Sequence, residues 1–316
     1  MRRIALVALL LMASTAAYAV PTVWAEQSDK KFFKGMLFSS SGSGHIKKFA
    51  KTSDEIPDLK RVGLLAFSVY QPATKKVKKT YTSGGIVYNS IYAPYISDEG
   101  VFEFTDVVYG RALPAMKESM QAQGIDLLLP EEYLDTPEKQ QVFDNATFEN
   151  SKTWKAVTAF INRLNAKETK AHPEGQKFVM IANADASIWR SVGKLAGDLD
   201  LDALLVVEST YTFDNGNQIT LRKIDMSLIG PNTVPDSEKN SKKYAPFGPL
   251  KGYLEGVVYG NLAGMYSKSA ILIARMKKDR YTETHFDGLG TIYGRIVGEL
   301  LIRTNGEIEK LASRVK

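Results

Sequence analysis

The stretch LDALLVVESTYTFDNGNQITLRKIDMSLIGP, Leu201–Pro231, has the pattern of two antiparallel strands joined by a tight turn. Its first strand begins with apolar residues on both faces, as a central strand of a sheet does. The sequence DNGN, Asp214–Asn217, supplies residues that adopt the positive φ angles of a tight turn. The second strand alternates polar and apolar residues, and the adjacent Arg222 and Lys223 interrupt this alternation as a β-bulge would. These features predict a sheet that is built outward from this hairpin.

Helices and further strands precede and follow the hairpin. Short apolar runs predict strands at Arg61–Val69, Ile125–Pro130, Gln176–Ala184 and Lys268–Lys278. Apolar residues at helical spacing and capping signals predict helices at Thr105–Gly124, Pro137–Phe148, Asn150–Lys167 and Asp185–Leu199, and from Gly288 onward with a break at Asn305-Gly306. Thr105 and Thr136 are the predicted amino-terminal caps of the first two helices. The residues predicted to face inward are Ile188, Val192 and Leu195 in the fourth helix and Ile292, Ile296, Leu300 and Leu301 in the last. The chain is therefore expected to be an α/β protein (α+β mixed), with a mixed β-sheet flanked by helices.

The order of these elements resembles the small α/β domain shared by the TolB amino-terminal domain, the curli secretion channel protein CsgG and the penicillin-binding-protein activator LpoB. The resemblance rests on a first strand, two helices that each lead into a strand, and a fourth strand: RVGLLAFSVY (Arg61–Tyr70), YGRALPAMKESMQAQGIDLLLPEEYL (Tyr109–Leu134), VGKLAGDLDLDALLVVESTYTF (Val192–Phe213) and ITLRKIDMSLIGPNT (Ile219–Thr233). It implies a TolB-N/CsgG-like core and a role as an envelope accessory protein. It transfers no catalytic residue, because this fold group has none to transfer.

Three features depart from that group. The chain has no cysteine for a lipid to modify, and no propeller follows the α/β core. The segment from Thr136 to Asp185 inserts an additional helix-strand unit. We therefore expect one α/β domain over residues 60–316, preceded by a flexible segment over residues 26–59 that includes the Gly- and Ser-rich stretch Phe38–Phe49.

Residues 1–25 have the layout of a secretory signal peptide. Two arginines precede a short apolar run, and either AYA (Ala17–Ala19) or VWA (Val23–Ala25) supplies the small residues of a cleavage site. Removal of the two arginines lowers the formal net charge of +6 by two, and a surplus this small does not indicate a nucleic-acid partner. The expected location is the periplasm or the exterior, without a stable transmembrane span in the mature form and without disulfides.

No pattern of catalytic or metal-binding residues emerges from the sequence. The three histidines, His45, His172 and His285, lie far apart, and none has a partner four residues away. Ser191 and Lys194 have the S-x-x-K spacing of serine acylases but lack the companion motifs of those enzymes. We therefore expect no catalytic residue, no metal site and no cofactor.

The best candidate for binding is an excursion over residues 71–100, too long for a plain connection. It is a long loop, an inserted hairpin or a mobile flap, and it is either a binding element or a solvated insertion. Lysines attract anions, and tyrosines stack on sugars or pack against a partner. The candidate binding residues are Lys75, Lys76, Lys78, Lys79, Tyr81, Tyr88, Tyr92 and Tyr95.

Glycine recurs at every fourth position from Gly248 to Gly264. On a helix this spacing forms a stripe without Cβ atoms, which allows another backbone to approach closely. The alternative is a glycine-rich loop that leads into a strand. The candidate close-packing residues are Gly252, Gly256, Gly260 and Gly264.

Together these features favour an exported, non-enzymatic cell-envelope accessory protein, a scaffold or a partner-binding module. Its expected partner is an envelope protein or an anionic envelope polymer, and an oligomer remains open. The alternative is an exported hydrolase or a small-molecule-binding protein with a pocket at the strand ends. Buried carboxylates in a concave site would favour this alternative, whereas a flat tyrosine-rich patch would favour the accessory protein.

Overall fold

The hairpin predicted over Leu201–Pro231 lies at the centre of the fold. The structure, a computed structural model, describes residues 20–34, 36–39, 59–71, 74–82, 85–93, 98–148, 169–179, 186–214, 218–231, 256–265, 271–277 and 280–315. Strand β7 (Ala203–Asp214) pairs antiparallel with β8 (Gln218–Pro231), which confirms the two predicted strands. Their register shifts between Thr210, which faces Lys223, and Tyr211, which faces Leu221, so that it passes over Arg222; this confirms the predicted bulge. The turn residues between the two strands are outside the described ranges.

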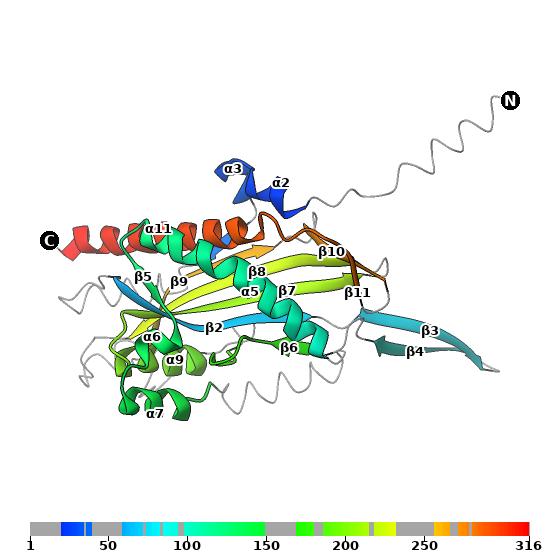
Figure 1. Cartoon of the computed structure of the whole chain (residues 1–316), viewed down its shortest axis with the longest axis horizontal. Helices are drawn as coiled ribbons and strands as arrows, with labels where there is room; N and C mark the ends of the chain where they lie inside the picture. The colour runs from blue at the N-terminus through cyan, green and yellow to red at the C-terminus, as the bar shows by residue number, and fades with distance from the viewer. Residues whose placement is uncertain are drawn as a thin grey trace.

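The hairpin belongs to a nine-stranded mixed sheet with the order β1-β9-β8-β7-β2-β5 (Figure 1). The further strands of this path are β1 (Met36–Ser39), β2 (Arg61–Gln71), β5 (Asp126–Leu128) and β9 (Gly256–Met265). Off the path, β6 (Thr169–Ala171) pairs with β2, β10 (Ile271–Lys277) pairs with β8, and β11 (Arg280–Thr284) pairs with β10. Strand β2 is parallel to β5 and β7, and the other pairs are antiparallel. The predicted mixed α/β fold is thus confirmed.

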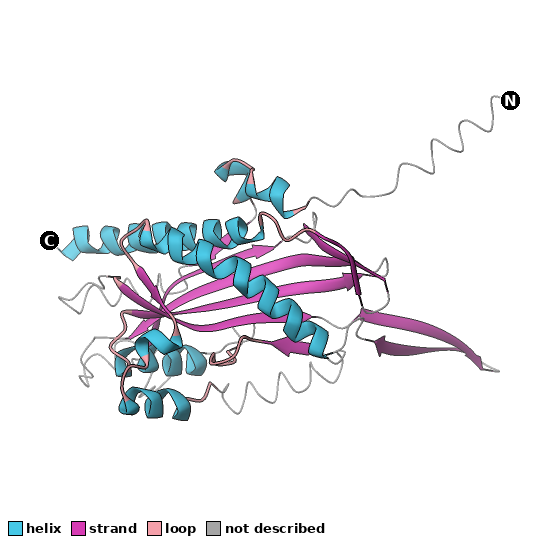
Figure 2. Ribbon diagram, viewed as in Figure 1, coloured by secondary structure: helices cyan, strands magenta, loops and turns pink. Residues whose placement is uncertain are grey.

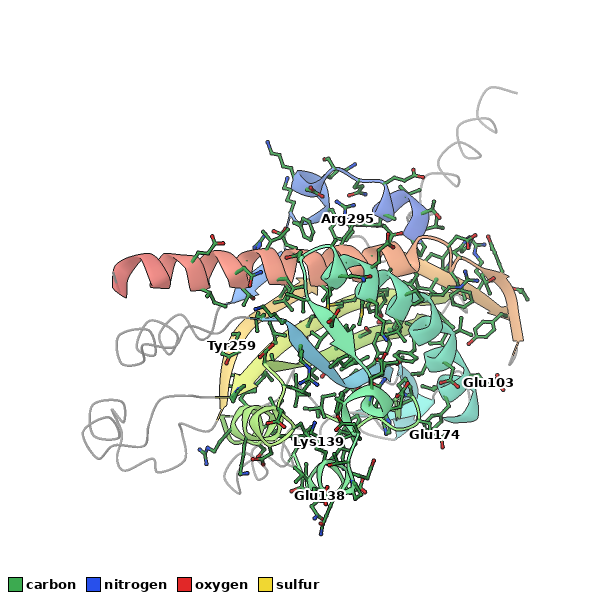
Figure 3. All side chains as sticks on the ribbon, turned by 60° about the vertical axis from the view of Figure 1, so that its left-hand side comes forward. Glu103, Glu138, Lys139, Glu174, Tyr259 and Arg295 are labelled. Atoms are coloured by element: carbon green, nitrogen blue, oxygen red, sulfur yellow. The ribbon has the colours of Figure 1, made fainter. Side chains whose placement is uncertain are left out.

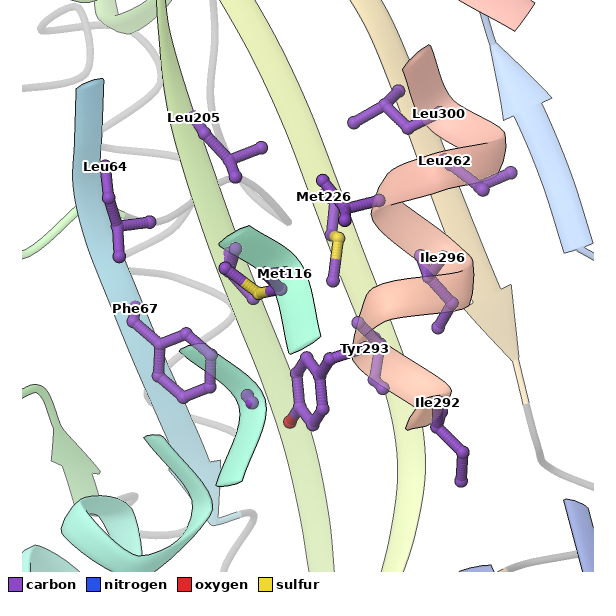
Figure 4. Close-up of a cluster of buried hydrophobic side chains, with 14 of the residues drawn as sticks. Leu64, Phe67, Met116, Leu205, Met226, Leu262, Ile292, Tyr293, Ile296 and Leu300 are labelled. Atoms are coloured by element: carbon purple, nitrogen blue, oxygen red, sulfur yellow. The ribbon is translucent and has the colours of Figure 1, made fainter. Parts of the chain in front are cut away.

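Two long helices, α5 (Asp98–Gln121) and α11 (Leu289–Val315), cover one face of the sheet (Figure 2). The close-up in Figure 4 shows their apolar side chains against those of the strands. The apolar residues of α11 that helical spacing predicted to face inward are fully buried: Ile292, Ile296, Leu300 and Leu301. Burying large apolar side chains such as these stabilises the fold by about 1.5–3 kcal/mol each.

Three shorter helices pack on the opposite face of the sheet: α6 (Pro130–Tyr133), α7 (Pro137–Asn145) and α9 (Ala186–Asp198). Thr136 caps α7 as predicted, because its side chain accepts a hydrogen bond from the Lys139 amide at 3.3 Å. The predicted inward face of α9 is also confirmed, with Ile188, Val192 and Leu195 buried. The sheet therefore has a helical layer on each face.

The acidic stretch between α9 and β7 ties the beginnings of two parallel strands together. The Asp202 carboxylate accepts hydrogen bonds from the amides of Lys60 and Arg61 at 2.8 and 2.7 Å. Asp200 precedes it with a φ of 55°, a conformation that aspartate tolerates better than most residues. This stretch thus sets the start of β7 beside the start of β2.

The segment expected to be flexible, residues 26–59, is ordered at its beginning. Helix α3 (Asp29–Phe32) follows α2 (Pro21–Ala25), and β1 pairs antiparallel with β9 at one edge of the sheet. Phe32 is buried in the main core. Part of this segment is therefore regular secondary structure, and residues 35 and 40–58 lie outside the described ranges.

Three further predictions of secondary structure are wrong. Helix α5 begins at Asp98, so Thr105 lies inside it and donates its hydroxyl hydrogen bond to the Val101 carbonyl instead of capping a helix. Residues 176–179 form no strand, although the Lys177 amide donates to the Leu65 carbonyl at 3.1 Å. The predicted break at Asn305-Gly306 is absent, since α11 is continuous through it.

The glycine-spaced segment is a strand where the structure describes it. Gly256, Gly260 and Gly264 lie in β9, so the prediction of a close-packed helix is wrong for these three. Gly260 is opposite Leu228 and Gly264 is opposite Ile224, two residues of the core that α11 covers. Gly248 and Gly252 lie outside the described residues, and no helix among the described residues is both long and apolar enough to cross a membrane.

Candidate functional sites

The excursion over residues 71–100 contains an antiparallel hairpin, β3 (Thr74–Thr82) and β4 (Gly85–Ala93). These strands form a two-stranded sheet of their own, with no backbone pairing to the nine-stranded sheet. Figure 1 shows the hairpin extending past the end of the main sheet, on the side away from the carboxyl terminus. Of the three predicted alternatives, the structure therefore has an inserted hairpin.

The register of this hairpin brings several of the predicted binding residues to one face. Lys75 lies opposite Tyr92, and Lys79 lies opposite Tyr88. Since side chains alternate between the faces of a strand and directly opposite residues share a face, these four positions fall on the same face as Tyr81. Lys76 and Lys78 occupy positions of the other face, and Tyr95 lies outside the described residues.

The charge of the hairpin is of one sign. The chain has no aspartate or glutamate between Leu59 and Ser97, whereas β3 alone contains four lysines. A two-stranded hairpin is only marginally stable in water without further packing. A basic, tyrosine-bearing hairpin outside the main sheet is therefore suited to contact an anionic partner.

A second candidate site, which the sequence analysis did not find, is a buried polar row on the face of the sheet that carries α9. Ser68 of β2 lies opposite Glu208 of β7, which lies opposite Asp225 of β8. Their exposed fractions are 3%, 5% and 3%, respectively. Lys223, two residues before Asp225 on the same strand, forms an ion pair with the Asp225 carboxylate. Two carboxylates and one ammonium group thus share a buried strip of the sheet.

The electrostatics of this row centre on Asp225. Burial raises the pKa of the Asp225 carboxyl, and the hydrogen bond and charge of Lys223 oppose that shift in part. The Oδ1 atom of Asp225 and the Oγ atom of Ser68 are buried and have no hydrogen-bond partner among the residues that the structure describes. Buried polar atoms of this kind commonly bind an ordered water. The row can therefore hold a proton, a water or a small polar ligand.

Replacing Asp225 by asparagine tests the buried charge. A carboxyl whose pKa is raised in the folded state favours folding when it is protonated, and this contribution is lost as the pH rises through the folded-state pKa. At pH 7 we therefore expect Asp225→Asn to be at least as stable as the parent. As the pH falls toward the ordinary aspartate pKa of 3.8, the parent should gain stability relative to the variant. Urea unfolding of both proteins between pH 4 and pH 8 measures this difference, and a constant difference would show that Asp225 does not titrate abnormally.

A third polar cluster lies on the other face of the sheet, in the core beneath α5 and α11, and it stabilises the packing there. The Tyr293 hydroxyl is 2.6 Å from the Ser209 Oγ and 3.0 Å from the Tyr211 hydroxyl, and all three residues are fully buried. Burial raises the pKa of Tyr293 to about 12, so its hydroxyl stays protonated at neutral pH. This cluster satisfies buried hydroxyls between α11 and β7, as core polar groups require.

The structure describes most of the residues that were considered for catalysis or metal binding. Lys194 forms its ion pair with Asp198, one turn further along α9. His172 contacts the Pro173 carbonyl, His285 lies beside Glu283, and His45 is outside the described residues. Among the described residues, no group of three or more histidine, cysteine, aspartate or glutamate side chains could hold a metal ion.

The chain matches no protein-family model, and no curated protein or solved structure is significantly similar to it. The class of protein is thus defined by the fold and the candidate sites alone: a mixed α/β protein with a basic hairpin outside its main sheet. Its function has to be inferred from these residues.

Proposed function

We propose that this chain is an exported, non-enzymatic accessory protein of the cell envelope that binds an anionic partner through the β3–β4 hairpin. The partner is an envelope protein or an envelope polymer with a negatively charged surface. In this proposal the nine-stranded sheet and its helices form the scaffold, and the hairpin supplies recognition. The leader-like residues 1–19 support export to the periplasm or the exterior.

One observation carries this proposal: the hairpin is separate from the main sheet and has positive charge only. Lys75 and Lys79 share a face with Tyr81, Tyr88 and Tyr92 by register. Lysine attracts an anionic surface over several ångströms, and tyrosine adds a large contact area with little loss of side-chain entropy. The two residue types together are suited to an anionic partner that also offers apolar or sugar surfaces.

The order of the elements supports the envelope part of the proposal. Apart from the β3–β4 hairpin after β2, strand β2, helix α5 and strand β5 come in this order, and α9 leads into β7 and β8. The sequence resembles the TolB-N/CsgG/LpoB-like group in this order of elements. Helix α7 and strand β6 lie between these two units, within the segment Thr136–Asp185 that was predicted as an insertion. Because the resemblance implies an envelope accessory fold and transfers no catalytic residue, it favours an accessory protein over an enzyme.

Changing Lys75, Lys76, Lys78 and Lys79 together to serine tests the proposal. Exposed charges contribute at most about 1 kcal/mol each to stability, so the melting temperature should stay nearly unchanged. Capture of the partner from an envelope extract should fall at least tenfold at low salt, where charges are least screened. The matched control is Lys30, Lys31 and Lys34 to serine, which removes exposed lysines from the amino-terminal segment and should leave capture unchanged. Equal capture by the parent and the hairpin variant would remove the hairpin from the function.

The buried row of Ser68, Glu208 and Asp225 favours a second candidate, a small-molecule-binding protein. The buried Asp225 Oδ1 and Ser68 Oγ atoms, which have no hydrogen-bond partner among the described residues, suit a small cationic ligand that donates hydrogen bonds. A thermal-shift screen of the parent with small cations and amines tests it, because a ligand that binds the folded state raises the melting temperature. A shift that disappears in Asp225→Asn would support this candidate, and the absence of any shift would reject it.

A further inference from the structure

The residues directly after the first predicted cleavage site are packed into the folded domain. Pro21 of α2 is buried, and Trp24 packs against the main core with its ring 6.4 Å from that of Phe32, edge to face. The Thr22 hydroxyl donates a hydrogen bond to the Asp287 carbonyl at 3.1 Å, across 265 positions of sequence. Helix α2 is therefore held by residues near the opposite end of the chain.

One arginine of α11 fixes this amino-terminal segment (Figure 3). Nη1 of Arg295 donates hydrogen bonds to the carbonyls of Ala25 and Gln27 at 2.9 and 2.8 Å, and Nη2 contacts the Asp29 carboxylate at 2.6 Å. Its guanidinium also lies 3.9 Å from the centre of the Phe32 ring. The fixed fork of an arginine suits such a set of acceptors, and the flat guanidinium stacks on aromatic rings.

The loop before α11 is shaped to receive α2. Gly288 has a φ of 82°, and a Cβ atom at this position would lie 2.7 Å from the Thr22 backbone nitrogen and 2.9 Å from the Pro21 carbonyl carbon. Both its backbone conformation and the space beside it therefore require glycine. Gly288 thus fits closely against Pro21 and Thr22, and cleavage after Ala25 would remove both of these residues.

We propose that the leader is removed between Ala19 and Val20, and that α2 remains as the first element of the mature domain. This inference rests on the proposed export of the chain. Hydrolysis of the Ala19–Val20 amide consumes one water and leaves a carboxylate on Ala19 and an α-amino group on Val20. The alternative site after Ala25 is a part of the fold, because the Ala25 carbonyl accepts from Arg295 and the Glu26 amide donates to the Thr22 carbonyl at 3.1 Å.

Intact-mass measurement of the full chain after export in a bacterial host tests the inference. A mature protein that begins at Val20 is the expected result. A protein that begins at Glu26 would overturn this inference but leave the proposed export intact. A protein that still begins at Met1 would overturn the export on which both proposals depend.

Two variants sharpen this test. Replacing Ala17 and Ala19 by leucine removes the small residues of the first site, so the chain should retain its leader. Replacing Val23 by glutamate alters the second site at a residue that is 52% exposed in the fold, so processing should be unchanged. If Val23→Glu blocks processing while the Ala17/Ala19 variant is cleaved normally, the inference is wrong.

Leaderless chains that start at Val20 and at Glu26, each after an initiator methionine, separate the role of α2 from export. The shorter chain lacks the α2 contacts with Asp287, Gly288 and Arg295, so its melting temperature should be lower by about 5 °C or more. Equal melting temperatures would show that α2 is not an element of the mature fold and would overturn the inference.

Discussion

Gly294→Leu is expected to lower the free energy of unfolding by about 3 kcal/mol or more, the largest loss of stability that we expect from a single substitution in this protein. A Cβ atom at Gly294 of α11 would lie 2.8 Å from the Ala115 carbonyl oxygen and 3.2 Å from the Ala115 Cβ of α5. A larger side chain at this position would push α5 and α11 apart. Because both helices pack on the same core, their separation would disturb that core and cost stability. Urea unfolding followed by circular dichroism measures the loss.

The spacing of glycines on α11 extends this contact over several turns. Cβ atoms at Gly290 and Gly298 would lie 2.3 Å from the Arg111 carbonyl oxygen and 2.6 Å from the Ser119 Oγ, respectively. The three glycines, each four positions apart, thus face three residues of α5 with the same spacing. The backbones of the two long helices therefore approach closely at Gly290 and Gly294, and the Ser119 side chain fills the space beside Gly298.

Gly306→Ala is the matched control for Gly294→Leu. It lies in the same helix, but a Cβ atom there has nothing within 4 Å. Because alanine is the better helix former by about 1 kcal/mol, this change should stabilise the protein slightly. Similar effects of the two substitutions would contradict the close approach of α5 and α11.

Arg295→Ala is expected to cost about 2–3 kcal/mol and to release the amino-terminal segment. The substitution leaves the Ala25 and Gln27 carbonyls and the Asp29 carboxylate without their shared donor. It also removes the guanidinium that lies on the Phe32 ring. Limited proteolysis should then cut within residues 20–39 well before the rest of the domain, because locally destabilised segments open first.

Two comparisons make the Arg295 result specific. Arg295→Lys keeps the charge but should lose most of the stabilisation that Arg295 provides, since an ammonium group cannot reproduce the guanidinium fork. Arg275→Ala breaks a pair with Glu283 in which both side chains are about half exposed, and it should cost no more than about 1 kcal/mol. If Arg295→Ala resembles Arg275→Ala in stability and proteolysis, α2 and α3 are not fixed through this residue.

The hairpin β7–β8 and the helices α9 and α11 could be predicted from sequence because their signals are local. Strand alternation, the turn at Asp214–Asn217 and the bulge at Arg222 all lie within one continuous stretch. Thr105 was misleading because a threonine hydroxyl bonds either the amide of a helix start or a carbonyl one turn back within a helix. The apolar run that begins at Gln176 was misleading because apolar residues indicate burial, whereas a strand also needs a series of backbone hydrogen bonds to a neighbouring strand. The Lys177 amide makes one such bond, to the Leu65 carbonyl, and residues 176–179 do not form a strand.

Glycine spacing illustrates a limit of periodicity. Residues four apart share a face on a helix and on a strand alike, so the spacing of Gly256, Gly260 and Gly264 fits both. Their strand pairs with β8 and β1, and this pairing is not visible in the segment itself. The helical glycine contact exists instead at Gly290 and Gly294, at the same four-residue spacing.

The candidate sites were predictable to different degrees. The lysines and tyrosines of residues 71–100 were visible in the sequence as a candidate binding segment. That Lys79 lies opposite Tyr88 could be seen only from the pairing of β3 with β4. Glu208 and Asp225 each stand alone inside an apolar run, VVEST and KIDMS, and a single acid there gives little signal. Only the pairing of β7 with β8 makes them neighbours. The packing of residues 25–33 involves Arg295, whose position is far away in the sequence.

Site-specific photo-crosslinking in the envelope is the most direct test of recognition by the hairpin. A photoreactive phenylalanine analogue replaces Tyr88 of β4 in one protein and Ile302 of α11, which is 60% exposed, in another. We expect a crosslinked partner from position 88 that weakens when the four lysines of β3 are changed to serine, and none from position 302. Crosslinking from position 302 alone, or from position 88 with no dependence on the lysines, would contradict binding of an anionic partner through this hairpin.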